Sequence, residues 1–186
     1  SVMLPTGGDF TNPAGGKISG ASVNNYAGKY STITNAGSLT VGTGNSNGSG
    51  IYFAKGGEYT GLESGIIEGK KYGIQFLGEH SNTLNNAGLI SGLTNSIVIS
   101  GKSSSVLNNS NTGEITSITG DGILIKDTAS VDLKNSGEIT GGNGVAINFS
   151  GTGINSLTLD SGSAPNGNVV SNTSDTNKVN LINLGR

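Results

Sequence analysis

The sequence contains no cysteine, no tryptophan, three prolines and a single arginine, Arg186, among 186 residues. The lack of cysteine excludes a disulfide framework, a zinc site with thiolate ligands and a cysteine nucleophile. Only 12% of the residues are charged, and the formal net charge is −2. Nucleic-acid-binding proteins normally carry a stripe of Lys and Arg residues together with stacking aromatic residues. The sequence therefore predicts no nucleic-acid partner.

Long apolar runs are missing as well. No run reaches the ~18 apolar residues that a membrane-spanning helix needs. Leu, Ile, Val and Phe are sparse, whereas 33 glycines accompany many Asn, Ser and Thr residues. This composition alone is typical of disorder, but the apolar residues recur at fixed offsets. Their periodicity indicates a folded chain.

One short motif recurs along the chain. Its best copy spans residues 135–149, N-S-G-E-I-T-G-G-N-G-V-A-I-N-F. The copies are aligned by one glycine each: Gly16, Gly37, Gly65, Gly88, Gly113, Gly137 and Gly162. Successive glycines are 21–28 residues apart. A period of this length indicates a solenoid in which each repeat forms one turn.

Each repeat contains three short segments in which apolar residues alternate. The first segment precedes the motif, the second follows the motif glycine, and the third is the most regular. The third segments are Ile51-Tyr52-Phe53, Ile74-Gln75-Phe76, Ile97-Val98-Ile99, Ile123-Leu124-Ile125 and Val145-Ala146-Ile147. Alternation with β-branched residues, bounded by Gly, Asn and Ser, is typical of strands joined by turns.

The pattern predicts an all-β fold, a single right-handed parallel β-helix that forms a three-sided solenoid of about seven rungs. Residues 31–186 form the β-helix repeats. Residues 1–30 fit the period poorly, and we expect them to form an irregular first rung and an N-terminal cap.

Equivalent residues of successive turns stack ~4.8 Å apart in such a fold. Phe53 is therefore expected over Phe76, and Ile99 over Ile125 and Ile147. The motif glycines suit a positive φ or a close neighbouring turn. The asparagines two positions earlier are expected to stack as an amide ladder; they are Asn35, Asn86, Asn111 and Asn135.

The recurring pattern N-[AST]-G-x-[IL]-x-G followed by G-[IV]-x-[IF] resembles the passenger domains of bacterial autotransporters, the type V secretion proteins. The resemblance covers roughly residues 33–160. It implies a right-handed parallel β-helix that is secreted or held at the bacterial surface. It also implies that membrane contact occurs only through a C-terminal translocator barrel, which is absent from this chain.

Enzymatic activity is one alternative, because polysaccharide lyases and hydrolases also use β-helices. Lyases need a strong base, often Arg or Lys, and hydrolases need paired carboxylates. Glu114 and Glu138 share one offset on adjacent repeats, with Asp121 nearby, so this acidic cluster is a candidate for weak cation binding. His80 has no second His or Cys as a partner. We therefore predict no catalytic residue, no metal site and no cofactor.

Surface contacts are the remaining route to function. The middle residues of the third segments are expected to point outward and form a contact face: Tyr52, Gln75, Val98, Leu124 and Ala146. Three lysines follow these segments and are expected to form a basic edge beside the face: Lys55, Lys102 and Lys126. An apolar and aromatic stripe on a surface strand is typical of an interaction site, unless loops or the N-terminal cap cover it.

We therefore expect an exported bacterial protein that acts by binding, as an adhesin or virulence factor. Its partner would be a host cell-surface protein or receptor, a neighbouring bacterial surface, or a second copy of the chain. Two alternatives stay open. The resemblance alone suggests a secreted ligand that activates a host receptor and promotes vessel growth, and the β-helix class suggests a polysaccharide-active enzyme.

Circular dichroism tests the fold class. The far-UV spectrum should show β-structure with negligible helix, although the apolar content is low. A random-coil spectrum, or a helix content above about a tenth, which is well below the average for globular proteins, would contradict the solenoid.

Overall fold

The structure is a computed structural model that describes residues 2–20, 23–25, 30–41, 48–172 and 178–181. Arg186 lies outside these ranges. Within them the regular secondary structure is β-strand and no helix occurs. Every ladder contact is parallel and joins strands of neighbouring turns, as for β10 (Tyr72–Phe76), which pairs with β7 (Ser49–Phe53) and β13 (Asn95–Ile99). The chain is therefore an all-β parallel solenoid, as the sequence predicts.

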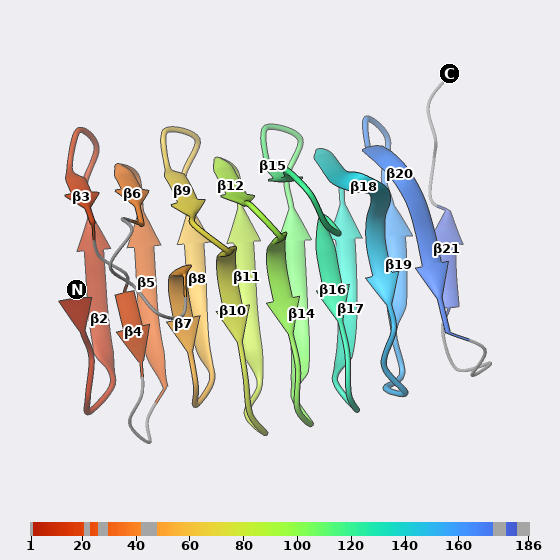
Figure 1. The fold of residues 1–186 in the computed structure, drawn as a ribbon, viewed down its shortest axis with the longest axis horizontal. Helices are drawn as coiled ribbons and strands as arrows, with labels where there is room; N and C mark the ends of the chain where they lie inside the picture. The colour runs from red at the N-terminus through yellow and green to blue at the C-terminus, as the bar shows by residue number, and fades with distance from the viewer. Residues whose placement is uncertain (1, 21–22, 26–29, 42–47, 173–177, 182–186) are drawn as a thin grey trace.

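The strands stack into three ladders along the long axis (Figure 1). The first ladder is an eight-stranded sheet made of β2 (Gly8–Asn12), β5 (Ser31–Asn35), β8 (Gly57–Gly61), β11 (Asn82–Asn86), β14 (Ser104–Asn109), β17 (Ser130–Asn135), β19 (Ser156–Leu159) and β21 (Lys178–Leu181). The second ladder consists of β3 (Lys17–Ser19), β6 (Ser38–Thr40), β9 (Ile66–Gly69), β12 (Leu89–Gly92), β15 (Glu114–Ser117) and the beginning of β18 (Glu138–Phe149).

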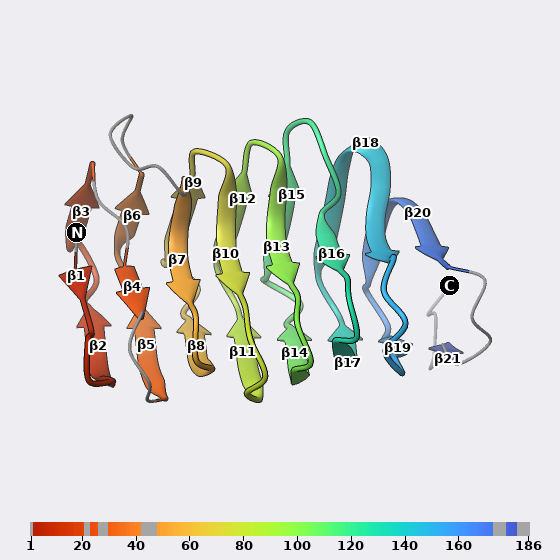
Figure 2. The ribbon, with the colours of Figure 1, turned by 60° about the horizontal axis from the view of Figure 1, so that its bottom comes forward.

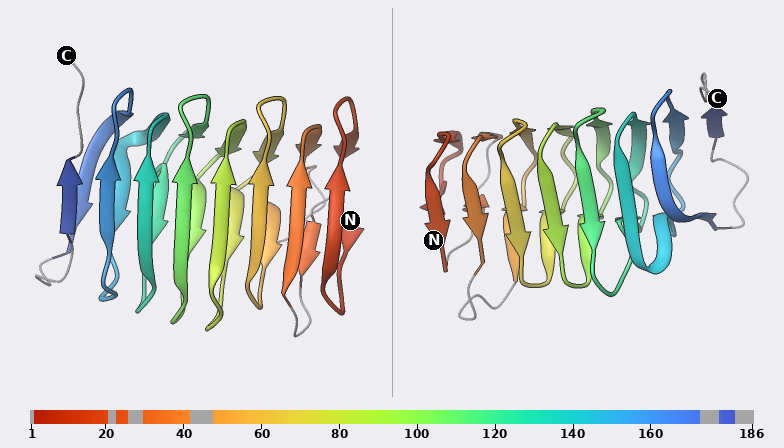
Figure 3. Two further views of the ribbon diagram at one scale, coloured as in Figure 1. Left: turned by 180° about the vertical axis from the view of Figure 1, so that it is seen from behind. Right: turned by 90° about the horizontal axis from the view of Figure 1, so that it is seen from above.

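The third ladder contains β1 (Val2–Met3), β4 (Val23–Asn25), β7, β10, β13, β16 (Ile123–Ile125) and the end of β18. It lies toward the viewer in Figure 2. Because β18 bends from the second ladder into the third, these two ladders form one 13-stranded sheet. β20 (Ala164–Ser171) pairs with β18 along both parts. Figure 3 shows the turns following one another from β2 to β21. The hand of the coil and its three-sided cross-section stay predictions.

Apolar side chains of successive turns stack in the core as continuous columns. Phe53 pairs with Phe76, as predicted, and their rings are nearly parallel (5°) with centroids 4.9 Å apart. Ile99 pairs with Ile125, also as predicted. All four side chains are fully buried. The core is thus a set of apolar columns that run along the solenoid rather than a central cluster.

One turn of the predicted stacking is wrong. Ile147 pairs with Ile123 instead of lying over Ile125, and Phe149 takes the position beside Ile125. The third segment of this turn is therefore 147–149 rather than 145–147. Both triplets alternate in the same way, so alternation alone could not distinguish them.

The shift places Ala146 inside the solenoid, not on its surface. Ala146 is fully buried, and it immediately precedes the first core residue of its segment. From β7 onward, small residues occupy this position in the third ladder: Gly50, Gly73, Ser96, Gly122 and Ala146. A Cβ atom at Gly73 would lie 2.7 Å from Cγ2 of Ile90, because the second ladder packs closely there. Only small side chains fit.

Stacked asparagines line the end of the first ladder. Nδ2 of Asn12 donates to Oδ1 of Asn35, Asn86 donates to Asn109, and Asn109 donates to Asn135, each over 2.9 Å. All five asparagines are at most 4% exposed. The predicted amide ladder is present. The turn that contains β14 uses Asn109 rather than Asn111, which is exposed.

The amide ladder is interrupted at Gly61, which lies in register between Asn35 and Asn86. The hydroxyl of Tyr59 occupies the space that a side chain at Gly61 would enter. Within the described residues this hydroxyl has no hydrogen-bond partner of normal geometry. Burial raises the pKa of Tyr59 well above its ordinary value, and the side chain of Asn35 opposes the rise only in part. Tyr59 is therefore a neutral part of the core.

Close packing between turns explains the motif glycines. A Cβ atom at Gly88 would collide with the carbonyl oxygen of Gly65, and one at Gly137 would collide with that of Gly113. Gly162 is the one motif glycine with a positive φ (89°), and its Cβ position is not crowded. Of the two predicted reasons for glycine, the close neighbouring turn therefore applies from Gly37 to Gly137, and the positive φ applies to Gly162.

The N-terminal segment joins the ladders from its first long strand. β2 pairs with β5 from Gly8↔Ser31 to Asn12↔Asn35, and β3 pairs with β6. The part of residues 1–30 that the structure describes therefore continues the repeat, although it fits the sequence period poorly.

A charge in an apolar column should disrupt the solenoid. Ile123 is fully buried, so Ile123→Asp places an unpaired carboxylate in the core and should lower the free energy of unfolding by several kcal/mol. Leu124→Asp is the control, because Leu124 points outward in the same strand. Chemical denaturation measures both. Equal destabilisation would show that the inward and outward positions are misassigned.

The amide ladder gives a second stability test. Asn109→Ala removes a buried side chain that donates to Asn135 and accepts from Asn86, and it should cost about 1–3 kcal/mol because buried polar groups lose their partners. Asn108→Ala, one residue away on the outward side, should change stability by less than about 0.5 kcal/mol. Thermal melts of both variants compare the two positions. A neutral Asn109→Ala would mean that the ladder contributes nothing to stability.

Candidate interaction face

The outward positions of β7, β10, β13, β16 and β18 form one column on the third ladder. Its members pair in register from turn to turn, and we call this column the contact face: Tyr52, Gln75, Val98, Leu124 and Asn148. Parallel pairing separates neighbouring side chains by ~4.8 Å. The backbone ladder beneath holds the column rigid.

Two predicted members of this face are not accessible. Val98 is only 3% exposed, and it pairs with Gln75 on one side and Leu124 on the other. Ala146 is fully buried, and Asn148 takes its place in the column. Tyr52, Gln75, Leu124 and Asn148 are partly exposed, so the accessible face is shorter and more polar than the sequence predicts.

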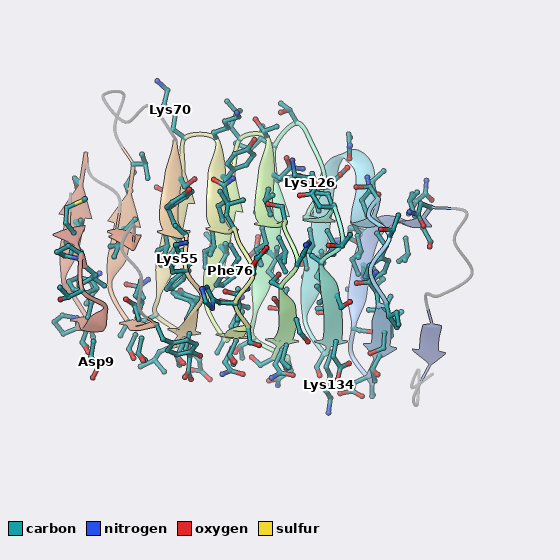
Figure 4. All side chains as sticks on the ribbon, turned by 90° about the horizontal axis from the view of Figure 1, so that it is seen from below. Asp9, Lys55, Lys70, Phe76, Lys126 and Lys134 are labelled. Atoms are coloured by element: carbon teal, nitrogen blue, oxygen red, sulfur yellow. The ribbon has the colours of Figure 1, made fainter. Side chains whose placement is uncertain are left out.

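The predicted basic edge carries both signs of charge. Lys55, Lys102 and Lys126 are all exposed in the loops that follow β7, β13 and β16, and Figure 4 labels Lys55 and Lys126 on separate turns along the solenoid. Asp127 follows Lys126 directly, and its carboxylate accepts a hydrogen bond of 3.0 Å from the backbone N–H of Gly101. The edge is therefore only weakly positive.

The opposite edge of the face contains Tyr72, which the prediction missed. Tyr72 begins β10, and Nζ of Lys71 lies 4.9 Å from the centroid of its ring. Beside it, Ser49 donates a 3.2 Å hydrogen bond to Oε1 of Gln75. The glycine that follows Tyr72 breaks the alternation, so no pattern in the sequence placed this ring on an outward surface.

Asp121 is a buried acid that holds one end of the contact face in place. It is 7% exposed, and its two carboxylate oxygens accept hydrogen bonds from Asn143 (2.7 Å) and Asn148 (2.9 Å). The carboxylate therefore orients Asn148 at the surface. Both amides lie more than twenty residues from Asp121 in the sequence, which is why sequence reasoning missed the network.

The acidic cluster that the sequence suggests does not assemble as a metal site. Glu114 and Glu138 pair on adjacent turns, as predicted. Glu138 accepts hydrogen bonds from Thr140 (3.0 Å) and Asn166 (2.7 Å), whereas Asp121 is occupied by its two asparagines. Within the described ranges no group of three or more His, Cys, Asp or Glu residues could hold a metal ion.

His80 is exposed in the loop between β10 and β11. Its backbone carbonyl accepts a 3.2 Å hydrogen bond from Asn82. The residue therefore lies in a surface turn.

Comparisons with protein-family models, with curated proteins and with solved structures found no match. Among the described residues no helix is long and apolar enough to cross a membrane.

Proposed function

We propose that the protein acts by binding a partner protein through the contact face. The observation that supports this proposal most is the in-register column from Tyr52 to Asn148, in which four of the five side chains are partly exposed. Large side chains such as Tyr52 and Leu124 tend to carry interface energy. They are fixed on a paired backbone, so little conformational entropy is lost when a partner docks.

The biological setting of this proposal comes from the sequence resemblance. The protein would be the passenger of a bacterial autotransporter, exported to the bacterial surface or secreted, and its partner would be a host cell-surface protein or a bacterial surface. The mixed charge of the lysine edge fits a modest electrostatic contribution. Lysines at the rim of an interface affect the association rate and its salt dependence more than the affinity.

Removing the two largest accessible side chains tests the proposal. Tyr52→Ser combined with Leu124→Ser should abolish binding of the soluble protein to host or bacterial cells, measured by flow cytometry, because both anchors are lost. The melting temperature should change little, because both positions are only partly buried.

The matched control is Glu114→Gln with Glu138→Gln on the second ladder. This variant should bind like the parent. If the folded Tyr52/Leu124 variant binds normally while the glutamine variant does not, the acidic edge is the site and the contact face is not.

A further inference from the structure

A groove runs along the outer side of the first ladder, away from the contact face. It encloses about 410 Å³ and lies between two rows of side chains that pass from turn to turn. One row consists of Thr60, Asn85, Asn108 and Lys134, which pair in register at the outward positions of β8, β11, β14 and β17. The other row lies two positions further along each turn, just beyond the ends of these strands, and consists of Leu62, Ala87, Ser110 and Ser136.

Small side chains keep the groove open. Ala87 and Ser110 form its middle wall, and each stacks on the previous turn through a 2.9 Å backbone hydrogen bond. The two rows extend over four turns, or about 14 Å at the spacing of a parallel ladder. The hollow therefore suits an elongated ligand that lies parallel to the solenoid axis.

The groove has no net charge. Lys134 is the only titratable residue of its lining, and its Nζ lies 3.1 Å from a carboxylate oxygen of Asp160. The same oxygen accepts a 3.1 Å hydrogen bond from Ser136. This ion pair closes one end, and Figure 4 shows Lys134 projecting at the edge of the molecule. An anionic or cationic ligand would find no uncompensated partner charge.

The polar groups of the groove are amides and hydroxyls with unused capacity. Nδ2 of Asn108 donates to Oδ1 of Asn85 over 2.9 Å. Within the part of the chain that the structure describes, Nδ2 of Asn85 and Oδ1 of Asn108 make no hydrogen bond. One donor and one acceptor thus lie on adjacent turns and face the hollow. Leu62, 46% exposed, adds an apolar surface at the other end.

These features distinguish a glycan from a peptide as the ligand. An extended peptide binds by pairing with a free strand edge or, when it is proline-rich, by docking into an aromatic-lined groove. Here the strands cross the groove, their backbone groups pair with the neighbouring turns, and the lining contains no aromatic residue. The walls offer only side chains. A sugar hydroxyl both donates and accepts hydrogen bonds, which matches the free amide groups, and the C–H faces of sugar rings match Leu62 and Ala87. We propose that this groove binds a linear, uncharged glycan.

Binding of short linear oligosaccharides tests the proposal. Neutral oligomers of glucose, mannose, galactose and xylose are compared with oligogalacturonate by saturation-transfer NMR and titration calorimetry. At least one neutral oligomer should bind the parent protein. Asn85→Ala combined with Asn108→Ala should weaken this binding about tenfold, the effect of losing two hydrogen bonds. Ala87→Trp should remove it by filling the hollow.

The matched control changes the neighbouring outward pair of the same strands. Thr83→Ala with Val106→Ala lies on β11 and β14 outside the groove and should bind as the parent does. Melting curves establish that each variant is folded, and the asparagine variant decides the result if Ala87→Trp does not fold. The proposal fails if no neutral oligomer binds, if only oligogalacturonate binds, or if binding survives in the folded asparagine variant.

The groove is independent of the proposed protein-binding function. The Tyr52→Ser, Leu124→Ser variant should bind the oligosaccharide as the parent does, because its changes lie on the third ladder. Loss of cell binding with intact glycan binding, or the reverse, therefore separates the two sites.

Discussion

Parallel hydrogen bonding between successive turns is the interaction on which the rest of this structure depends. Each strand has its backbone partners one turn away, so a residue at a given position lies over the same position of the next turn. The stacked Phe53 and Phe76 rings, the buried asparagines and the close-packed motif glycines all follow from this register. A turn alone buries too little apolar surface to be stable. Stacking on the neighbouring turns buries the additional apolar surface that a stable fold requires.

The same register determines which surfaces are available for function. Outward positions also align, so each ladder presents columns of side chains at a constant spacing. On the third ladder the column offers Tyr52 and Leu124 with Asn148, which the buried Asp121 orients. On the first ladder, two columns separated by a bend leave a neutral groove floored by small residues and amides. Two different kinds of surface thus arise from one repeated backbone.

Much of the fold, and less of the site, could be predicted from the sequence. The alternation of apolar residues and the glycine spacing were sufficient for the parallel solenoid and for the Phe53–Phe76 stack. Alternation has a period of two, however, so it is unchanged when a segment shifts by two residues. It therefore could not decide whether the third segment of the turn that contains β18 is 145–147, with Ala146 in the middle, or 147–149, with Asn148 in the middle. The column of small residues that precedes each third segment carried that information. The burial of Val98 and the Asp121 network depend on contacts between turns, which no local pattern records.

The break in the amide ladder at Gly61 has a consequence for how the molecule opens. The asparagine amides all donate toward the C-terminal end, so their dipoles align and strengthen one another within an unbroken run. Gly61 divides them into a short run that ends at Asn35 and a longer one that begins at Asn86. The unpartnered Tyr59 hydroxyl lies at this division. We therefore expect two cooperative units that exchange their amide hydrogens separately, with local opening beginning at the turn between them.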